Sequence, residues 1–212
     1  MMKNIDMRLY FITDSTGYTD EEFCIRVESA LKGGVTLLQL REKEKTTREY
    51  IDLAEKVHTL AQKYNVPLII DDRVDVALAV DAEGVHLGQS DMQINIARRI
   101  MGESKIIGAT AKTLEQAREA YLQGADYLGV GAIYPTTTKV KTVITSTDTL
   151  MDICSAVSIP VNAIGGLNKD NIYILKGINI SGICVVSAIM KSDDPEIAAK
   201  ELMCAYNELK GR

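Results

Sequence analysis

The feature that most constrains the fold is a regular alternation of short apolar runs with longer amphipathic stretches along the whole chain. Eight runs have the length and composition of β-strands, and they recur at intervals of roughly 25 residues. Most are apolar at consecutive positions, which is typical of parallel strands covered on both faces. The predicted strands are Leu9–Thr13, Thr36–Leu40, Pro67–Ile70, Gly84–Leu87, Lys105–Ala109, Tyr127–Val130, Pro160–Ala163 and Gly182–Val186.

The stretches between these strands have a helical period. Leu53 and Val57 begin one apolar helical face, and Thr113 is placed to cap the start of another helix. Gly33 and Gly124 follow helical runs, where a left-handed residue is expected. The pattern predicts an α/β protein, a single (β/α)₈ TIM-barrel domain over residues 1–212. A doubly wound open sheet is the alternative, because alternation alone does not require closure.

Composition limits the function classes. The net charge of -5 gives no reason to expect a nucleic-acid partner, and no apolar run is long enough to span a bilayer. The four cysteines form no CxxC pair, which favours reduced thiols over a disulfide framework or a zinc site. With no signal-peptide pattern at the N-terminus, we expect a cytoplasmic protein.

In a barrel of this kind the active site lies at the carboxyl ends of the strands. Polar side chains gather at those ends: Gln39, Arg41, Lys43, Asp71, Asp72, His86, Gln89, Asp91, Thr110, Lys139 and Ser187. Asp72 and Asp91 are expected on adjacent loops, where two carboxylates with substrate phosphates suit Mg²⁺. The alternative is that the two aspartates only cap a helix and a turn.

Two phosphate sites are predicted at this mouth. Arg41, Lys43 and Lys139 suit a diphosphate, although solvated rim charges are the plainer interpretation. The pair Gly165-Gly166 and the nearby Ser187 suit a monophosphate held by backbone N–H groups, although the glycines could form only a tight turn. Two such sites suggest an enzyme that joins two phosphorylated molecules or moves one between positions.

No nucleophile is evident in the sequence. His58 is expected on the exposed side of its helix, and His86 is expected to pack or to hydrogen-bond at a strand end. No cysteine has a neighbour that would activate it, which argues against covalent catalysis. The patternless segment 134–147, rich in threonine and lysine, is expected to form a functional loop such as a lid.

Several segments resemble the thiamine-phosphate synthase family in the family's order and over almost the whole chain. They are TLLQLREK (36–43), IDDRVD (70–75), GVHLGQSD (84–91), GVGAIYPTTTK (129–139), AIGG (163–166) and VVSA (185–188). The resemblance implies a Mg²⁺-dependent transferase. It would condense 4-amino-2-methyl-5-hydroxymethylpyrimidine diphosphate with a thiazole phosphate, carboxylated in many organisms, to give thiamine phosphate and pyrophosphate.

The resemblance also implies site residues. The pyrimidine diphosphate would be bound by Gln39, Leu40, Arg41, Glu42, Lys43, Asp71, Thr110 and Lys139. Of these, Arg41, Lys43, Thr110 and Lys139 would be catalytic. The thiazole phosphate would be bound by Thr136, Thr137, Thr138, Gly166, Val186 and Ser187. One Mg²⁺ would be held by Asp72 and Asp91.

The chain departs from the family pattern at two positions: Asp71 replaces the usual Asn, and Thr110 replaces the usual Ser. Asp71 loses an amide donor and adds negative charge beside the diphosphate, which would either weaken binding or hold Mg²⁺ more tightly. The alternatives to a synthase are a thiazole tautomerase-like barrel and a non-catalytic metabolite sensor. The expected partners are phosphorylated small molecules. The sequence leaves open whether the chain is a monomer or a homo-oligomer.

Overall fold

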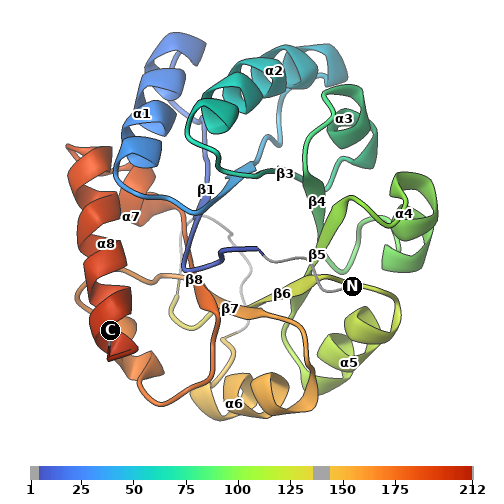
Figure 1. Cartoon of the computed structure of the whole chain (residues 1–212), viewed down its shortest axis with the longest axis vertical. Helices are drawn as coiled ribbons and strands as arrows, with labels where there is room; N and C mark the ends of the chain where they lie inside the picture. Colours follow the sequence, from blue (N-terminus) through green and yellow to red (C-terminus); the bar gives the residue numbers. More distant parts are fainter. Residues whose placement is uncertain (1–4, 136–143, 212) are drawn as a thin grey trace.

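Eight parallel strands close into a barrel in their sequence order, with β8 paired back onto β1 (Figure 1). The computed structural model describes residues 5–135 and 144–211. Closure confirms the (β/α)₈ prediction and excludes the open sheet. The strands are β1 (Leu9–Ile12), β2 (Leu37–Leu40), β3 (Leu68–Asp71), β4 (Gly84–Leu87), β5 (Ile106–Ala111), β6 (Tyr127–Gly131), β7 (Val161–Ile164) and β8 (Gly182–Val185).

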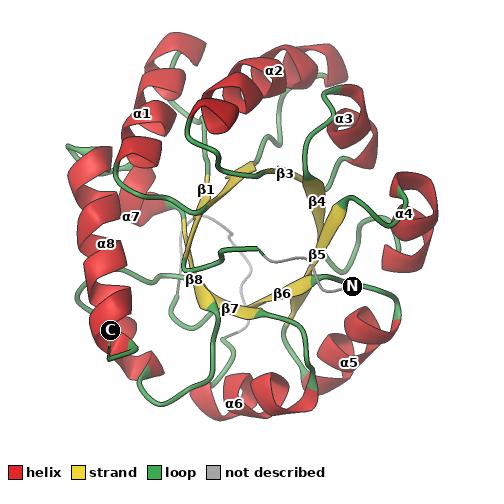
Figure 2. Ribbon diagram, viewed as in Figure 1, coloured by secondary structure: helices red, strands yellow, loops and turns green. Residues whose placement is uncertain are grey.

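The helices form an outer ring around the strands (Figure 2). The seventh crossover contains the 3₁₀ helix η1 (Ile172–Leu175) where the regular pattern predicts an α-helix, and two helices follow β8. The α-helices are α1 (Asp20–Lys32), α2 (Thr47–Lys63), α3 (Val74–Ala79), α4 (Ile94–Met101), α5 (Leu114–Leu122), α6 (Thr147–Ala156), α7 (Ser187–Met190) and α8 (Pro195–Leu209).

Threonine caps fix the starts of several helices. At α1 and α2, the capping Thr19 and Thr46 exchange hydrogen bonds with glutamates three residues later, which satisfies backbone N–H groups that the helix leaves free. Thr113 accepts a hydrogen bond from the backbone N–H of Gln116, as predicted for the start of α5. These caps end each strand-to-helix loop at a fixed residue and so limit where the loop side chains lie.

The predicted left-handed glycine after α1 is wrong by one residue. Gly124 has a φ of +95°, as expected, but Gly33 has a φ of −73° and the left-handed residue is Gly34, at +97°. Gly33 is needed for a different reason. A Cβ at that position would lie 2.4 Å from the backbone oxygen of Glu196 and 2.6 Å from the Cβ of Ala199, so its absence lets α8 pack closely.

Buried side chains form two layers. One fills the space between strands and helices, and the other fills the inside of the barrel. The inner layer is Met7, Tyr10, Ile12, Leu37, Ile69, Ile106, Tyr127 and Cys184. The barrel is therefore a packed core, so substrates can reach only its ends.

The prediction that His58 is exposed is wrong. Its Nδ1 lies 3.1 Å from the backbone oxygen of Val80 and its Nε2 lies 3.2 Å from Oε1 of Glu83, and only 8% of the residue is exposed. Glu83 also accepts a hydrogen bond from the backbone N–H of Leu68. The loop after α3 covers this face of α2, which the helical period of α2 alone does not reveal.

The four cysteines are free thiols, as expected. Within residues 5–135 and 144–211, none of the helices combines the length and the apolar character that crossing a bilayer requires.

Candidate active site

The carboxyl end of β2 presents the first group of predicted site residues. Gln39 and Leu40 are buried, and the chain then turns outward through Arg41. The turn is held by Thr13, whose hydroxyl accepts from the backbone N–H of Arg41, and by Tyr50, whose hydroxyl donates to the Leu40 carbonyl. The backbone that carries the cationic side chains is therefore fixed by neighbouring elements.

Two consecutive carboxylates follow at the end of β3. Asp71 is the last residue of the strand, and Asp72 has a φ of +59°, in the left-handed region that Asp tolerates better than most residues. The backbone N–H of Asp72 donates to the carbonyl of His86 on β4, which holds this turn against the next strand.

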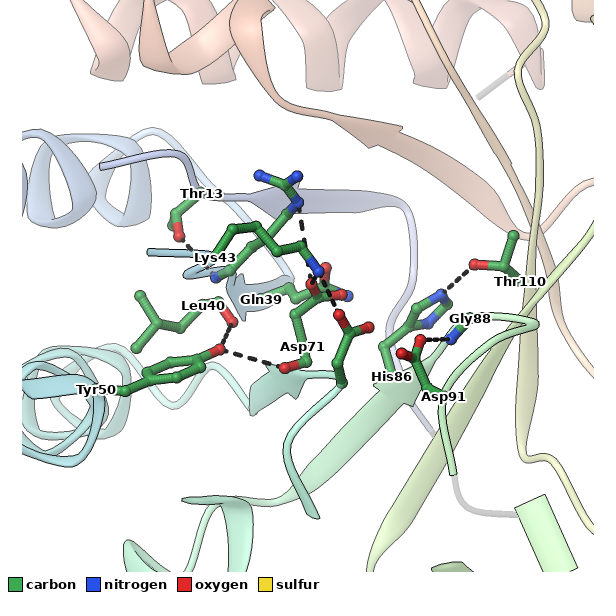
Figure 3. A network of polar contacts seen from close by, with 12 residues as sticks. Thr13, Gln39, Leu40, Lys43, Tyr50, Asp71, His86, Gly88, Asp91 and Thr110 are labelled. Carbon is green, nitrogen blue, oxygen red and sulfur yellow. Dashed lines mark hydrogen bonds and ion pairs between the residues drawn. The ribbon is translucent and has the colours of Figure 1, made fainter. Parts of the chain in front are cut away.

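Asp91 lies on the neighbouring loop after β4. Its Oδ2 accepts a hydrogen bond of 2.7 Å from the backbone N–H of Gly88, which orients the carboxyl group. Asp72 and Asp91 therefore lie on adjacent loops, as predicted, and Figure 3 shows Asp91 beside the end of β3 that carries Asp71.

Lys43 joins the carboxylates of β3. Its Nζ lies 2.6 Å from Oδ2 of Asp71 and also donates to Oδ2 of Asp72, and Nε of Arg41 lies 3.9 Å from Asp71 (Figure 3). Lys43 is therefore not an unpaired rim charge, the alternative that the sequence left open, although 40% of its side chain is exposed. Lys43, Arg41, Asp71, Asp72 and Asp91 form a charged cluster with more carboxylates than cations.

The carboxyl groups in the cluster are electrostatically distinct. Burial and the charge of Asp72 raise the pKa of Asp71 from 3.8 to about 6, although Lys43 and Arg41 act in the opposite direction. Burial and contact with Asp72 also raise the pKa of Asp91. Burial would raise the pKa of Asp72, but hydrogen bonds with Lys43 and Asp91 outweigh it and leave the pKa below its usual value.

The Asp72–Asp91 pair fits a hard divalent cation. The raised pKa of Asp91 reflects burial and a close second carboxyl group, and a cation shared by both groups would relieve that repulsion. Among the described residues, no three or more His, Cys, Asp or Glu side chains form a metal-binding group. Two carboxylates are nevertheless a ligand set that Mg²⁺ accepts, since Mg²⁺ commonly completes its shell with water and substrate phosphates.

A cavity of about 700 Å³ opens beside this cluster. Lys43, Asp72 and Asp91 form its polar side, and Leu78 and Ile100 from α3 and α4 form part of its apolar side. The cluster is therefore accessible to a small molecule.

Glu42 differs from its neighbours because its side chain faces another loop. One carboxyl oxygen accepts a hydrogen bond of 2.7 Å from the hydroxyl of Ser15, in the loop after β1. The other is buried and has no hydrogen-bond partner among residues 5–135 and 144–211. Burial raises the pKa of this carboxyl group. Glu42 therefore links the loops after β1 and β2.

The glycine pair after β7 lies where a side chain would clash with the neighbouring loop. Gly165 and Gly166 have φ angles of +104° and +65°. A Cβ at Gly165 would lie 2.4 Å from the Cβ of Ala132, and one at Gly166 would lie 2.7 Å from the Cβ of Tyr134. The loops after β6 and β7 thus approach each other closely, which accounts for both glycines and brings their backbone to the mouth.

Val186 and Ser187 lie directly after β8, next to β7 in the barrel. Ser187 is exposed and begins the short helix α7, and Val186 is half-buried. Both residues therefore follow the strand next to the one that the glycine pair follows. The predicted residues Thr136, Thr137, Thr138 and Lys139, with most of the proposed lid, lie outside the described residues.

Sequence reasoning missed a polar chain inside the barrel. The hydroxyl oxygens of Tyr10 and Tyr127 lie 2.7 Å apart, and they connect Gln39 on one side to His86 on the other. His86 in turn reaches Thr110, which confirms that it hydrogen-bonds at a strand end. The only signal was the phenol group of tyrosine within an apolar strand, since a buried hydroxyl requires a partner.

The fold and the site define the class: a (β/α)₈ barrel with cations and paired carboxylates at the carboxyl ends of its strands. The thiamine monophosphate synthase family model matches residues 9–189. A thiamine-phosphate synthase of Clostridium tetani is 48% identical over 97% of this chain and 99% of its own. One from Methanobrevibacter smithii is 47% identical over 95% and 96% of the two chains.

A solved thiamine phosphate pyrophosphorylase from Pyrococcus furiosus superposes with a TM-score of 0.88 at 41% identity, covering 96% of this chain and 97% of its own. The chain belongs to the thiamine monophosphate synthase family. It is accordingly an enzyme of the transferase class that acts in thiamine biosynthesis.

Proposed function

We propose that this enzyme condenses 4-amino-2-methyl-5-hydroxymethylpyrimidine diphosphate with a thiazole phosphate. The bond between the pyrimidine methylene carbon and the diphosphate oxygen breaks, and the thiazole nitrogen forms a new bond to that carbon. The products are thiamine phosphate and pyrophosphate. The observation that carries the proposal is the charged cluster of Arg41, Lys43, Asp71, Asp72 and Asp91, in a chain 48% identical to a named synthase.

The diphosphate is assigned to the cluster side of the mouth. Arg41 offers a planar fork and Lys43 a compact charge to the phosphoryl oxygens. Lys43 would exchange part of its contact with Asp71 and Asp72 for the diphosphate. Gln39, Leu40, Glu42, Asp71 and Thr110, with Lys139, complete this side of the proposal.

The thiazole phosphate is assigned to the opposite side. Gly166, Val186 and Ser187 offer backbone N–H groups and a hydroxyl, which bind a phosphate without requiring a cation. Thr136, Thr137 and Thr138 are assigned to the same phosphate.

The reaction requires a stabilised leaving group more than a nucleophile. We infer that pyrophosphate departs before the thiazole nitrogen attacks, so negative charge accumulates on the diphosphate side while the methylene carbon becomes cationic. Arg41 and Lys43, already in contact with the bound diphosphate, neutralise that charge, which costs little reorganisation as the bond breaks. Asp72 and Asp91 would hold Mg²⁺, which would supply Lewis-acid polarisation of the phosphoryl oxygens when bound.

We further propose that the enzyme acts in the cytoplasm as a single-domain barrel, with these two phosphorylated molecules as its partners. The presence of both predicted carboxylates and of Arg41 and Lys43 favours a synthase over a tautomerase-like or sensing barrel.

The test is a product assay with each substrate omitted in turn. Purified protein with Mg²⁺ should form thiamine phosphate only when both substrates are present. Rearrangement of the thiazole phosphate alone would indicate a tautomerase, and binding without any product would indicate a sensor. Either result would overturn the proposed reaction.

A further inference from the structure

A continuous chain of hydrogen bonds crosses the inside of the barrel beneath the mouth. Nε2 of Gln39 lies 2.6 Å from the Tyr10 hydroxyl, which lies 2.7 Å from the Tyr127 hydroxyl. Nδ1 of His86 lies 3.1 Å from the Tyr127 hydroxyl. Nε2 of His86 lies 2.9 Å from Oγ1 of Thr110, and Figure 3 shows this last contact. Both ends of this chain, Gln39 and Thr110, are assigned to the diphosphate side.

One direction along this hydrogen-bond chain uses the proton of every buried hydroxyl group. An amide nitrogen only donates, so the Tyr10 oxygen accepts from Gln39; in that direction the Tyr10 proton goes to the Tyr127 oxygen. The Tyr127 proton then goes to Nδ1 of His86, which must be unprotonated to accept it. The imidazole proton therefore lies on Nε2 and is donated to Oγ1 of Thr110.

We propose that Gln39, Tyr10, Tyr127 and His86 are positioning residues that fix the Nε2–H tautomer of His86 and make the Thr110 hydroxyl a donor toward the substrate. The Thr110 oxygen already accepts from His86, so its own proton is free to point to the mouth. This inference rests on the proposed function, in which Thr110 contacts the pyrimidine diphosphate. A hydroxyl held as a donor suits an anion better than a freely rotating one, because its orientation is settled before binding.

The surroundings keep both phenol groups protonated, as the chain of hydrogen bonds requires. Tyr10 and Tyr127 are buried, and burial raises the pKa of each hydroxyl well above its usual value. Each hydroxyl therefore remains able to accept one hydrogen bond and donate another. Their rings also meet edge to face, with centroids 5.7 Å apart, which restricts their rotation.

The second histidine supplies an internal reference. The chain contains two histidines, and Nδ1 of His58 faces the backbone oxygen of Val80, which can only accept. His58 must therefore carry a proton on Nδ1, whereas His86 is expected to carry its proton on Nε2. One spectrum of the whole protein compares both.

The experiment is long-range ¹H–¹⁵N correlation of the imidazole rings in histidine-labelled, ligand-free protein, assigned with His58→Gln. We expect the pattern of an Nε2–H neutral tautomer for His86. A proton on Nδ1, or on both nitrogens, would overturn the inference. This readout does not require turnover, so it stands or fails separately from the proposed function.

Variants test whether the chain of hydrogen bonds acts through Thr110. Tyr127→Phe removes the donor to His86 and should replace the single tautomer by a mixture. Tyr10→Phe, the deletion one link further away, removes the donor that directs the Tyr127 proton to His86; it should shift the tautomer in the same sense but less than Tyr127→Phe, because Tyr127 can still donate. An unchanged tautomer in Tyr10→Phe would remove Tyr10 and Gln39 from the positioning residues. Thermal melts establish that each variant is folded; if Tyr127→Phe does not fold, Tyr127→His and the wild-type spectrum decide the question.

Substrate binding completes the test. Tyr127→Phe should weaken pyrimidine diphosphate binding, as Kd or KM, by about tenfold while kcat changes less, because one hydrogen bond to a charged group loses its orientation. In a Thr110→Val background, the same change should have no further effect on binding. An equal loss in both backgrounds would show that Tyr127 does not act through Thr110.

Discussion

Replacing Asp71 with Asn should change how stability depends on pH in the metal-free protein. The pKa of Asp71 is raised from 3.8 to about 6 by burial and by the charge of Asp72. The folded state therefore binds this proton more tightly than the unfolded chain. The resulting stability is fully present below about pH 4 and is lost as the pH rises through about 6.

The magnitude follows from the two pKa values. Each tenfold change in proton affinity corresponds to about 1.4 kcal/mol, so the rise from 3.8 to about 6 corresponds to about 3 kcal/mol over the whole window. Roughly 1.4 kcal/mol of this falls between about pH 5 and pH 7.5, because Asp71 is still mostly protonated in the folded state at the lower value. Asn does not titrate, so Asp71→Asn should gain that amount relative to the wild type.

The measurement is urea denaturation of both proteins in EDTA at about pH 5 and pH 7.5, with the free energy of unfolding extrapolated to water. Asp75→Asn is the matched control. The hydrogen bond from Arg73 lowers the pKa of Asp75, so this group is ionised in both states across the range and the control difference should be flat. A flat difference for Asp71→Asn, or one that falls with pH, would refute the electrostatic account of the cluster.

Three further changes should separate activity from stability. Asp91→Ala should lower turnover by at least about a hundredfold and raise the Mg²⁺ concentration needed for activity. Calorimetry should show that thiazole phosphate binding is retained. Surviving activity would remove Asp91 from the metal site. Asp126→Ala should lower the free energy of unfolding by about 3 kcal/mol in urea titrations, because Asp126 pairs with Arg98 at 2.6 Å, while kcat per folded molecule is unchanged. Gly166→Ala should lower Tm and raise the KM for thiazole phosphate, because its φ is +65° and a Cβ would lie 2.7 Å from that of Tyr134; an unchanged KM would separate this loop from the phosphate.

The strands were predictable because period and apolarity depend on local sequence. All eight are present, and β4 has its predicted bounds. β3 and β5 extend beyond the prediction, through Asp71 and Ala111, because these polar or small residues still pair with β4 and β6. Pairing with a neighbouring strand is not visible in one run of sequence. The same holds for η1, since helical type in a crossover depends on how the segment packs.

The site was only partly predictable. The rule that polar residues gather at strand ends correctly predicted that Asp72 and Asp91 lie on adjacent loops. The sequence did not reveal that Lys43, which follows β2, contacts Asp71 at the end of β3. The contact between Tyr10 and Tyr127 was not predictable, because the sequence does not tell which strand residues face one another across the barrel. The prediction that His58 is exposed was wrong for a related reason, because the segment that buries it follows α3 and not its own helix.

The most direct test of the account is product formation by metal-stripped protein supplied with both substrates and titrated with Mg²⁺. We expect no turnover in EDTA, and recovery on adding Mg²⁺ with thiamine phosphate and pyrophosphate formed in equal amounts. Equal amounts follow from the proposed bond exchange, and metal dependence follows from the Asp72–Asp91 pair. Absence of product at every Mg²⁺ concentration would contradict the proposed function, and full activity in EDTA would contradict the metal site.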